Sequence, residues 1–287
     1  MHLGFWSMNT LREAAPDRLA VALEQAGFES LWYGEHSHIP LCRATPYPAG
    51  GPLPEPYWKM MDPYVSLMAA AAATTRLKLG TGIALLLERE LLSQAKTIVT
   101  LDRLSDGRVL LGAGVGWNEE EFANASSYPW RRRYSAVREV VAAQRRLFTE
   151  AEPEYHGEHV DFDPLLFEPK PLQAGGPPVI LGVMGVTGMR HAAAWADGWM
   201  PADVALPDPA GSIALFRGLL EEQGRRPEDA PITVVCMSPP SADFLRRLRD
   251  LEVARATLGV PVADWGKADA EMRLIERYQR LMPELAG

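Results

Sequence analysis

Two short apolar runs, each followed by alternating glycines, constrain the fold of this chain more than any other feature. Residues 77–79 form the first run and residues 109–111 form the second. Between them, residues 91–104 carry apolar positions with the period of an α-helix of about four turns. The pattern predicts a strand, a helix and a second strand parallel to the first, because such a crossover joins parallel neighbours. The glycines at the two strand ends are Gly80, Gly82, Gly112, Gly114 and Gly116.

These glycines predict where a ligand lies. Two parallel strands of one sheet end at the same edge, so both strands finish there on backbone without Cβ atoms. Glycine tolerates positive φ angles and allows a flat or anionic group to approach the main-chain amides closely. We therefore expect a ligand site at this edge of the sheet.

Several motifs in and after this stretch are characteristic in combination. They are Leu-Gly-Thr-Gly-Ile (79–83), Leu-Asp-Arg-Leu-Ser-Asp-Gly-Arg (101–108), Gly-Ala-Gly-Val-Gly-Trp-Asn-Glu-Glu-Glu-Phe (112–122), Tyr-His-Gly-Glu-His-Val-Asp-Phe (155–162), Pro-Lys-Pro-Leu-Gln (169–173) and Ala-Asp-Gly-Trp-Met-Pro (196–201). Together they resemble the luciferase-like flavin and deazaflavin oxidoreductases, and more narrowly the members that use the deazaflavin coenzyme F420. The resemblance covers most of residues 1–205 and thins afterwards.

Composition excludes several classes of protein. The 287 residues are 47% hydrophobic and 23% charged, as in ordinary globular proteins. The formal charge of −8, with no basic run longer than residues 131–133, argues against nucleic acid or an anionic membrane as the main partner. The apolar runs at 65–73 and 83–87 are far shorter than the roughly 18 residues that span a bilayer. The first residues lack the layout of a signal peptide.

The two cysteines indicate the compartment. Cys42 and Cys236 lie far apart in the sequence and show no Cys-x-x-Cys or Cys/His ligand spacing. We interpret them as free thiols in a reducing compartment, which predicts a cytoplasmic protein.

Eight alternations of strand and helix predict an α/β fold, the (β/α)₈ TIM barrel, as a single domain over residues 1–287 with an insertion after the fourth helix at about 153–177. A doubly wound open sheet is the competing fold, but Gly112 to Gly116 lack the Gly-x-Gly-x-x-Gly spacing of a dinucleotide-binding turn. The expected strands are 2–6, 28–33, 77–79, 109–111, 179–182, 198–201, 232–237 and 253–258. The expected helices are 16–26, 63–75, 91–104, 131–148, 187–196, 209–223, 242–251 and 264–281.

Two irregular segments interrupt this alternation. Residues 39–57 form a long loop rich in proline and glycine, and loops of this length in compact domains often act as lids. We expect residues 153–177 to form a small hairpin over the sheet edge. Both segments are expected to influence substrate choice, although the sequence does not identify the substrate.

In a TIM barrel the active site lies at the carboxyl ends of the strands. The side chains expected there make a wide and largely apolar mouth with few ionisable groups, which suits a planar cofactor. Four tryptophans, Trp6, Trp58, Trp117 and Trp130, are candidates to wall it. The residues expected at this edge are Trp6, Glu35, His36, Gly82, Ile83, Gly116, Trp117, Asn118, residues 182–188, Asp203 and Arg255.

His36 is the main catalytic candidate. It follows a strand end, and the adjacent Glu35 is expected to fix the tautomer of its ring or favour its protonated form, so that His36 moves a proton. The resemblance implies an acid-histidine pair here, usually Asp-His, beside the reactive carbon of the deazaflavin. The alternative is a loop histidine that caps a backbone carbonyl. His38 completes a His-x-His pair, but the further ligands of a metal-dependent hydrolase are not evident at later strand ends, so we expect no metal.

The resemblance also implies a seat for the cofactor. Gly82 and Ile83 stand where the family often has a cis peptide under the central ring, with a plain β-bulge as the alternative. The loop 182–188 enters a helix at about Thr187, and amides at a helix N-terminus bind anions. It would hold the cofactor phosphate with help from the turn at 114–117, and the arginines at 131–133 either meet an acidic cofactor tail or form a solvated face. The expected cofactor-binding residues are Gly82, Ile83, Gly114, Gly116, Trp117, Gly182, Gly185, Thr187 and Gly188.

The leading hypothesis from the sequence is an F420-dependent oxidoreductase that moves a hydride between the deazaflavin and a small organic substrate. An FMN-dependent monooxygenase on the same barrel is the nearest alternative. A non-catalytic flavin-binding or partner subunit is a second, and a metal hydrolase is a third. The resemblance further implies a homodimer.

Overall fold

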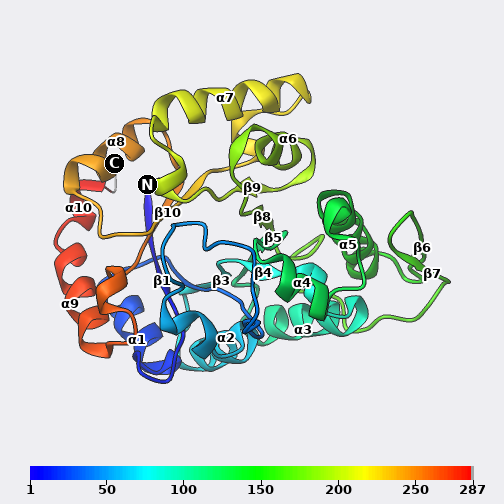
Figure 1. Cartoon of the computed structure of the whole chain (residues 1–287), viewed down its shortest axis with the longest axis horizontal. Coiled ribbons are helices and arrows are strands. Elements are labelled where there is room, and N and C mark those ends of the chain that lie inside the picture. Colours follow the sequence, from blue (N-terminus) through cyan, green and yellow to red (C-terminus); the bar gives the residue numbers. More distant parts are fainter. Residues whose placement is uncertain (286–287) are drawn as a thin grey trace.

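A barrel of parallel strands, surrounded by helices, forms the body of the protein. The computed structural model describes residues 1–285 (Figure 1). Around the barrel the strands follow the order β10-β11-β1-β2-β3-β5-β8-β9, and all neighbours are parallel. These strands are β1 (His2–Ser7), β2 (Ser30–Tyr33), β3 (Lys78–Thr81), β5 (Val109–Gly114), β8 (Val179–Leu181), β9 (Gly198–Trp199), β10 (Thr233–Cys236) and β11 (Arg255–Leu258).

Isolated parallel bridges join the last gap of the barrel. Trp199 pairs with Ile232 and Ala202 pairs with Val235, which brings β9 beside β10. The additional strand β4 (Ala84–Leu85) pairs with β5 beyond the end of β3. The sequence prediction of a (β/α)₈ barrel is therefore confirmed, and the open doubly wound sheet is excluded.

Helices cover the outside of the barrel (Figure 1). The side chain of Asp62 accepts hydrogen bonds from the first turn of α2, where Pro63 has no backbone N–H that would need an acceptor. The helices are α1 (Pro16–Ala26), α2 (Pro63–Ala73), α3 (Leu91–Leu104), α4 (Glu119–Ala125), α5 (Arg133–Thr149), α6 (Gly185–Trp195), α7 (Pro209–Glu222), α8 (Ala242–Asp250), α9 (Ala268–Gln279) and α10 (Met282–Leu285).

Three helix predictions need correction. The short α4 was not expected, because its first turn consists of three glutamates without an apolar period. Helix α6 begins at Gly185, two residues before Thr187, and α9 begins at Ala268 after a short 3₁₀ turn, not at residue 264.

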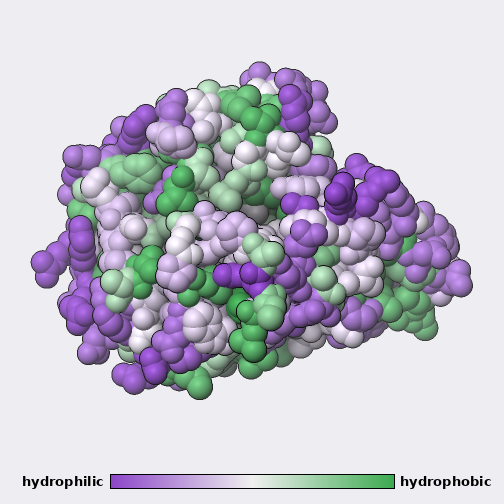
Figure 2. All heavy atoms as spheres, viewed as in Figure 1, coloured by the Kyte–Doolittle hydropathy of each residue, from purple (hydrophilic) through white to green (hydrophobic). Residues whose placement is uncertain are grey.

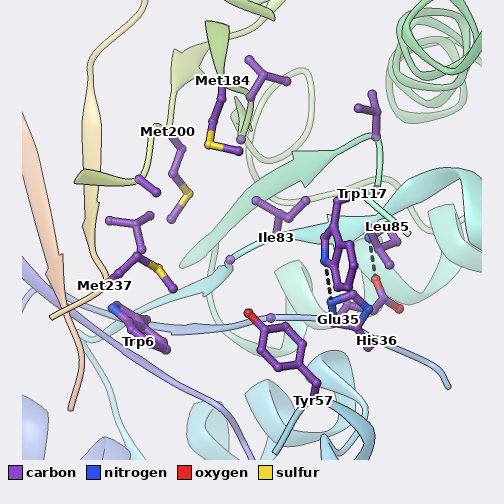
Figure 3. Close-up of a pocket in the computed structure, with 18 of the residues that line it drawn as sticks. Trp6, Glu35, His36, Tyr57, Ile83, Leu85, Trp117, Met184, Met200 and Met237 are labelled. Atoms are coloured by element: carbon purple, nitrogen blue, oxygen red, sulfur yellow. Dashed lines mark hydrogen bonds between the residues drawn. The ribbon is translucent and has the colours of Figure 1, made fainter. Parts of the chain in front are cut away.

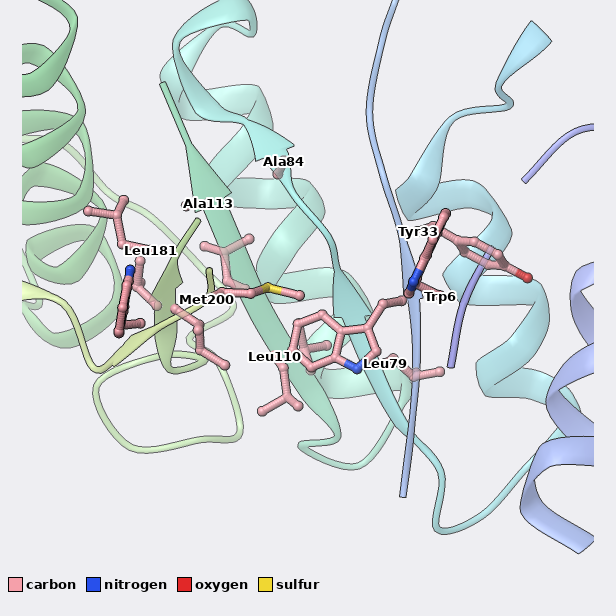
Figure 4. Packing of buried hydrophobic residues seen from close by; sticks show 14 of the residues in the cluster. Trp6, Tyr33, Leu79, Ala84, Leu110, Ala113, Leu181 and Met200 are labelled. Carbon is pink, nitrogen blue, oxygen red and sulfur yellow. The ribbon is translucent and has the colours of Figure 1, made fainter. Parts of the chain in front are cut away.

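Large buried side chains such as Leu110 and Met200 pack together in the core (Figure 4). Trp32 is fully buried. A Cβ atom on Gly80 would overlap the ring of Trp32, and one on Gly112 would overlap the carbonyl oxygen of Thr81. These two glycines therefore serve core packing. Of the five glycines at the ends of β3 and β5, Gly116 has a positive φ, at 73°.

The insertion forms the predicted hairpin, but in a different place. Strands β6 (Tyr155–His156) and β7 (Asp161–Phe162) pair antiparallel and project beside α5 (Figure 1). The Glu139 carboxylate on α5 accepts hydrogen bonds from the backbone amides of residues 158–160. Because this carboxylate holds the hairpin to the outer helix, the hairpin does not lie over the edge of the barrel, and no residue of 153–177 lines the pocket at the carboxyl ends of the barrel strands.

The loop 39–57 crosses the front of the barrel in the view of Figure 1. The Glu120 carboxylate on α4 accepts hydrogen bonds from the amides of Ala44 and Thr45, which fastens the middle of the loop. In this view hydrophilic side chains cover much of the left and right rim, and apolar ones form scattered patches between them and along the lower edge (Figure 2). Among residues 1–285, the helices include none long and apolar enough to cross a membrane.

Candidate functional site

A pocket of about 380 Å³ lies at the carboxyl ends of the barrel strands (Figure 3). Residues from the ends of β1, β2, β3, β5, β8, β9 and β10 line it, as the barrel predicts. The lining includes ten residues that the sequence placed at this edge, namely Trp6, Glu35, His36, Gly82, Ile83, Gly116, Trp117, Gly182, Val183 and Met184. It also includes Tyr57, Met60, Tyr134, Met200 and Met237, which the sequence did not indicate as residues of this edge.

His36 is held between two partners. Its Nδ1 lies 2.7 Å from Oε2 of Glu121 on α4, and its Nε2 accepts a hydrogen bond of 3.3 Å from the indole Nε1 of Trp117. The side chain of His36 is 8% exposed and that of Glu121 is 1% exposed. Because the indole nitrogen can only donate, this geometry places the ring proton on Nδ1, facing Glu121, and leaves Nε2 as an acceptor.

Glu35 does not orient His36, contrary to the expectation from the sequence. Its carboxylate accepts hydrogen bonds from the backbone amide of Leu85 (2.7 Å) and from Nε of Arg89. Burial raises the pKa of Glu35, and the nearby Arg89 and the Leu85 amide oppose that rise. Adjacent residues on an extended chain point in opposite directions, so Glu35 and His36 face different neighbours. The carboxylate that the sequence assigned to Glu35 is supplied by Glu121.

A third carboxyl group lies behind this pair. Glu88 ends the 3₁₀ turn η2 (Leu86–Glu88), which packs against α4. Burial, and then the charges of Glu121 and Glu35, raise the pKa of Glu88 to about 8. Glu88 is therefore mostly protonated at neutral pH.

The floor of the pocket is formed by Gly82 and Ile83, which are joined by a cis peptide bond as the resemblance implied. The Ile83 side chain lies against the backbones of Gly114 and Gly182, where a Cβ atom on either glycine would overlap it. Gly114 therefore supports the floor from below, and it does not line the pocket itself.

Aromatic rings pack around His36 on one side of the pocket. The ring centroids of Tyr57 and Trp117 lie 5.3 and 5.7 Å from that of His36. The Tyr47 ring of the long loop contacts both of these residues, at 5.3 Å from Tyr57 and 6.0 Å from Trp117. Arg43 of the same loop lies 5.3 Å from the Trp117 ring. The loop thus lies over the aromatic rings on this side of the pocket, and its expected role as a lid stays a prediction.

The opposite side is apolar. Trp6, Met200 and Met237 line it, and the indole Nε1 of Trp6 donates a 2.8 Å hydrogen bond to the carbonyl of Cys236 (Figure 3). Of the four candidate tryptophans, Trp6 and Trp117 therefore reach the pocket. Trp58 is 51% exposed, and Trp130 packs on Phe122.

The N-terminus of α6 lies at the rim. Met184 lines the pocket, and Gly185 begins the helix with a φ of 71°. No side chain caps the first turn, and residues 184–187 are exposed, so its amides are free to bind an anion. Gly185, Thr187 and Gly188 do not line the pocket but belong to this adjacent turn.

Other expected residues lie elsewhere. Arg255 begins β11 at the amino end of the barrel, where its guanidinium binds the Glu29 carboxylate at 2.7 Å. The Asp203 carboxylate accepts a hydrogen bond from the Met237 amide, and Asn118 is buried at the start of α4. His38 contacts Ser37 and Asn124 on the exposed side of the loop.

Two further groups can be placed. Arg131 and Arg132 are exposed, and Arg133 stacks on Trp130, so this run forms a largely solvated face. Within the described residues, Glu139, Glu158 and His159 are close enough together to hold a metal ion. The Glu139 carboxylate already accepts hydrogen bonds from three backbone amides. Neither His36 nor His38 belongs to this group. Cys42 is exposed, Cys236 is buried, and both are free thiols.

Comparison with known proteins assigns the family. Residues 7–281 match the family model described as luciferase-like monooxygenase. An uncharacterized protein of Mycobacterium tuberculosis is 37% identical over 267 residues, which cover 91% of this chain and 92% of that protein. The F420-dependent hydroxymycolic acid dehydrogenase of the same organism is 26% identical over 74% of this chain and 56% of its own length.

The fold agrees with this assignment. The solved structure of an F420-dependent secondary alcohol dehydrogenase, in complex with an F420-acetone adduct, superposes with a TM-score of 0.75 at 17% identity over 99% of this chain and 98% of that one. The chain therefore belongs to the luciferase-like monooxygenase family. This family resemblance was correctly predicted from the sequence.

Proposed function

We propose that this protein is an F420-dependent oxidoreductase that transfers a hydride between the deazaflavin and a small organic substrate. The observation that carries the proposal is the position of His36: a neutral imidazole of fixed tautomer, facing a largely apolar pocket at the carboxyl ends of the strands. A protein of this family named for F420 dependence, the hydroxymycolic acid dehydrogenase, supports the choice of cofactor.

The residues present fit a tricyclic cofactor with a phosphate. Gly82 and Ile83 give a flat, apolar floor, and Trp117 gives an aromatic wall. The free amides at the start of α6, with Gly185, Thr187 and Gly188, would hold the phosphate together with the turn at Gly116. When bound, the deazaflavin would supply the carbon that accepts or donates the hydride.

His36 would handle the proton that accompanies the hydride. Its Nε2 is bonded to Trp117 at 3.3 Å, a long hydrogen bond that a substrate hydroxyl can replace. When Nε2 takes up a proton, Nδ1–H continues to donate to Glu121, whose negative charge stabilises the imidazolium. Glu121 thus has the role that the sequence assigned to Glu35. Tyr57 and the loop at Tyr47 and Arg43 would exclude water from this side.

The assembly and organisation of the protein are part of the proposal. We expect one domain over residues 1–287, a small organic molecule as substrate and a homodimer in solution. Analytical ultracentrifugation of the purified protein measures the last of these directly, and a single monomeric species would contradict it.

A cofactor titration tests the proposal. Purified protein is titrated with F420 and, separately, with FMN, and binding is followed by the cofactor absorbance and by quenching of tryptophan fluorescence from Trp6 and Trp117. Saturable binding of F420 with much weaker binding of FMN is the expected result. Tight binding of reduced FMN without binding of F420 would favour the monooxygenase alternative and exclude the proposed cofactor.

A matched pair of variants separates cofactor seating from a general loss of fold. Gly182→Val pushes a side chain into the Ile83 floor and should weaken F420 binding strongly. Gly218→Ala lies on α7, with open space around it and no positive φ, and should leave F420 binding unchanged. Equal affinities in all three proteins would place the cofactor elsewhere.

A further inference from the structure

A second cavity lies behind the wall of the cofactor pocket. It encloses about 290 Å³ and is lined by Glu35, Ser37, Asp62, Leu85, Glu88 and Arg89. Glu35 and Leu85 line both cavities, so they form the partition between them. The outer side chains are partly exposed, 30% for Arg89 and 37% for Asp62, whereas Glu35 is 5% exposed. The second cavity therefore reaches solvent at Arg89 and Asp62 and ends at Glu35 and Leu85, which also line the cofactor pocket.

Glu88 stands at the junction of the two cavities. It lines the second cavity, and its Oε1 lies 3.3 Å from the place of a Cβ atom on Gly116, a residue that lines the cofactor pocket. Its Oε2 is buried and has no hydrogen-bond partner among the described residues. Oε1 of Glu121, the carboxylate that binds His36, is likewise buried without a described partner. Two neighbouring carboxyl groups thus each have an unpaired buried oxygen, an arrangement that is costly if both are ionised.

We propose that Glu88 is a positioning residue that acts on His36 through Glu121: it holds a proton while the pocket works at neutral pH, and it exchanges that proton with solvent through the second cavity. This inference rests on the proposed role of His36 in proton handling. While Glu88 is neutral, Glu121 is the negative charge that faces the imidazole. When Glu88 loses its proton, a second negative charge lies behind Glu121 and favours protonation of the ring.

The surrounding charges support this assignment. Glu121 from α4 and Glu35 after β2 face Glu88, and both disfavour its ionisation. Arg89 is committed to Glu35 and to Asp62, the capping residue of α2, so it does not neutralise Glu88. Burial and these two charges give Glu88 a pKa of about 8.

Histidine NMR tests the coupling without cofactor or substrate. The ring ¹⁵N shifts of His36, assigned by comparison with His36→Asn, are followed from pH 5 to 10, a span of about two units beyond the Glu88 pKa. The expected curve has an inflection near pH 8, at the pKa of Glu88. This inflection should disappear in Glu88→Gln, which keeps the size of the side chain and removes its ionisation.

Two controls remove the same charge elsewhere. Glu119→Gln lies exposed on α4, and Glu271→Gln removes the other buried glutamate whose pKa is raised to about 8. Both should retain the inflection. An additional variant, Glu121→Gln, should move it to lower pH, because the charge that disfavours ionisation of Glu88 is gone; this keeps the test decisive if Glu88→Gln fails to fold.

The outcomes are separable from those of the cofactor titration. A curve for the native protein without an inflection near pH 8, or an inflection that persists in Glu88→Gln, overturns the role of Glu88. Failure of F420 to bind would overturn the proposed cofactor, but it would not alter this measurement on the free protein.

Discussion

The two sides of the pocket are built differently. On one side His36 is fixed by hydrogen bonds to Glu121 and Trp117 and is enclosed by aromatic rings. On the other side Trp6, Met200 and Met237 present apolar surface. The first side thus fixes a proton in one position. The second offers unbranched, polarizable side chains that adapt to different shapes.

This difference separates chemistry from recognition. A fixed tautomer matters for a reaction in which one proton must move in one direction. Methionine side chains adjust to a bound molecule at little cost, so they suit recognition of an apolar group. We infer that substitutions on the His36 side change the rate of turnover, whereas those on the methionine side change what binds.

His36→Asn should have the largest effect. Asparagine retains a polar group in the site but removes the proton acceptor Nε2, so turnover should fall about 10²–10⁴-fold, the usual contribution of a general acid or base. F420 affinity should change little, because His36 is not part of the floor formed by Gly82 and Ile83. The deazaflavin absorbance in steady-state assays, with any substrate that supports turnover, measures the rate.

Unchanged turnover in His36→Asn would exclude His36 from the reaction. If turnover fell and F420 binding were lost as well, the residue would have a role in seating the cofactor. Trp58→Phe, a substitution of a ring that is 51% exposed and outside the pocket, serves as the control for aromatic changes nearby and should behave as the native protein.

Glu121→Gln should have a smaller effect on the same side. Glutamine can still accept from Nδ1–H of His36, but it lacks the charge that stabilises the imidazolium. A charge-assisted hydrogen bond is worth about 1.5–3 kcal/mol, so turnover should fall roughly 10- to 150-fold. The pH dependence of the rate should shift as well, which a purely structural substitution would not produce. Glu119→Gln on the exposed face of α4 is the matched control.

The sequence predicted the position of the pocket, at the carboxyl ends of the strands, better than the contacts that individual residues make there. The glycines at the ends of β3 and β5 correctly marked a pocket. However, Gly80 and Gly112 make room for the Trp32 ring and the backbone beside it, whereas Gly116 lines the pocket. Spacing alone cannot separate these roles, because a glycine that makes room for a core ring looks the same in sequence as one that makes room for a ligand.

The partner of His36 was missed for a related reason. Three consecutive glutamates open α4, and successive helical residues point about 100° apart. Glu119 is exposed, Glu120 holds the long loop, and Glu121 is buried against His36. Because the sequence does not show that a helix begins there, it does not show which way the Glu121 side chain points. Glu35 was chosen because it is adjacent in sequence, although neighbours on an extended chain face opposite directions.

Met237→Glu should weaken binding of an apolar molecule on the methionine side. The new carboxylate would lie close to Asp203, which accepts a hydrogen bond from the Met237 amide, and it would have to be desolvated when a ligand binds. Affinity for a neutral apolar dye such as N-phenyl-1-naphthylamine, measured by its fluorescence, should fall on the order of tenfold. Met237→Leu preserves volume and should cost less than about 1.5 kcal/mol of stability or binding. Equal losses in both variants would show that shape, and not polarity, governs this side.

A separate effect, on stability and not on turnover or binding, should appear in the pH dependence of unfolding, where each side has a glutamate of raised pKa behind it. Glu88 lies behind His36, and Glu271 of α9 lies behind β1, where it accepts a hydrogen bond from the Ala14 amide. Burial and the charge of Glu13 raise the pKa of Glu271 to about 8. For a carboxyl group whose pKa is higher in the folded state, the folded protein binds more protons than the unfolded chain between the two pKa values. The free energy of unfolding should therefore fall as the pH rises from 4.5 towards 8, by at most about 1.4 kcal/mol per pH unit for each group.

Urea denaturation at a series of pH values measures this slope. Glu271→Gln and Glu88→Gln should each make it less steep, because glutamine does not ionise in either state. The two sides would then differ in one respect: Glu88→Gln also removes the pH 8 inflection of His36, whereas Glu271→Gln leaves it in place. If either variant steepened the slope, the corresponding carboxyl group would be ionised in the folded protein, and its pKa would lie below that of the unfolded chain.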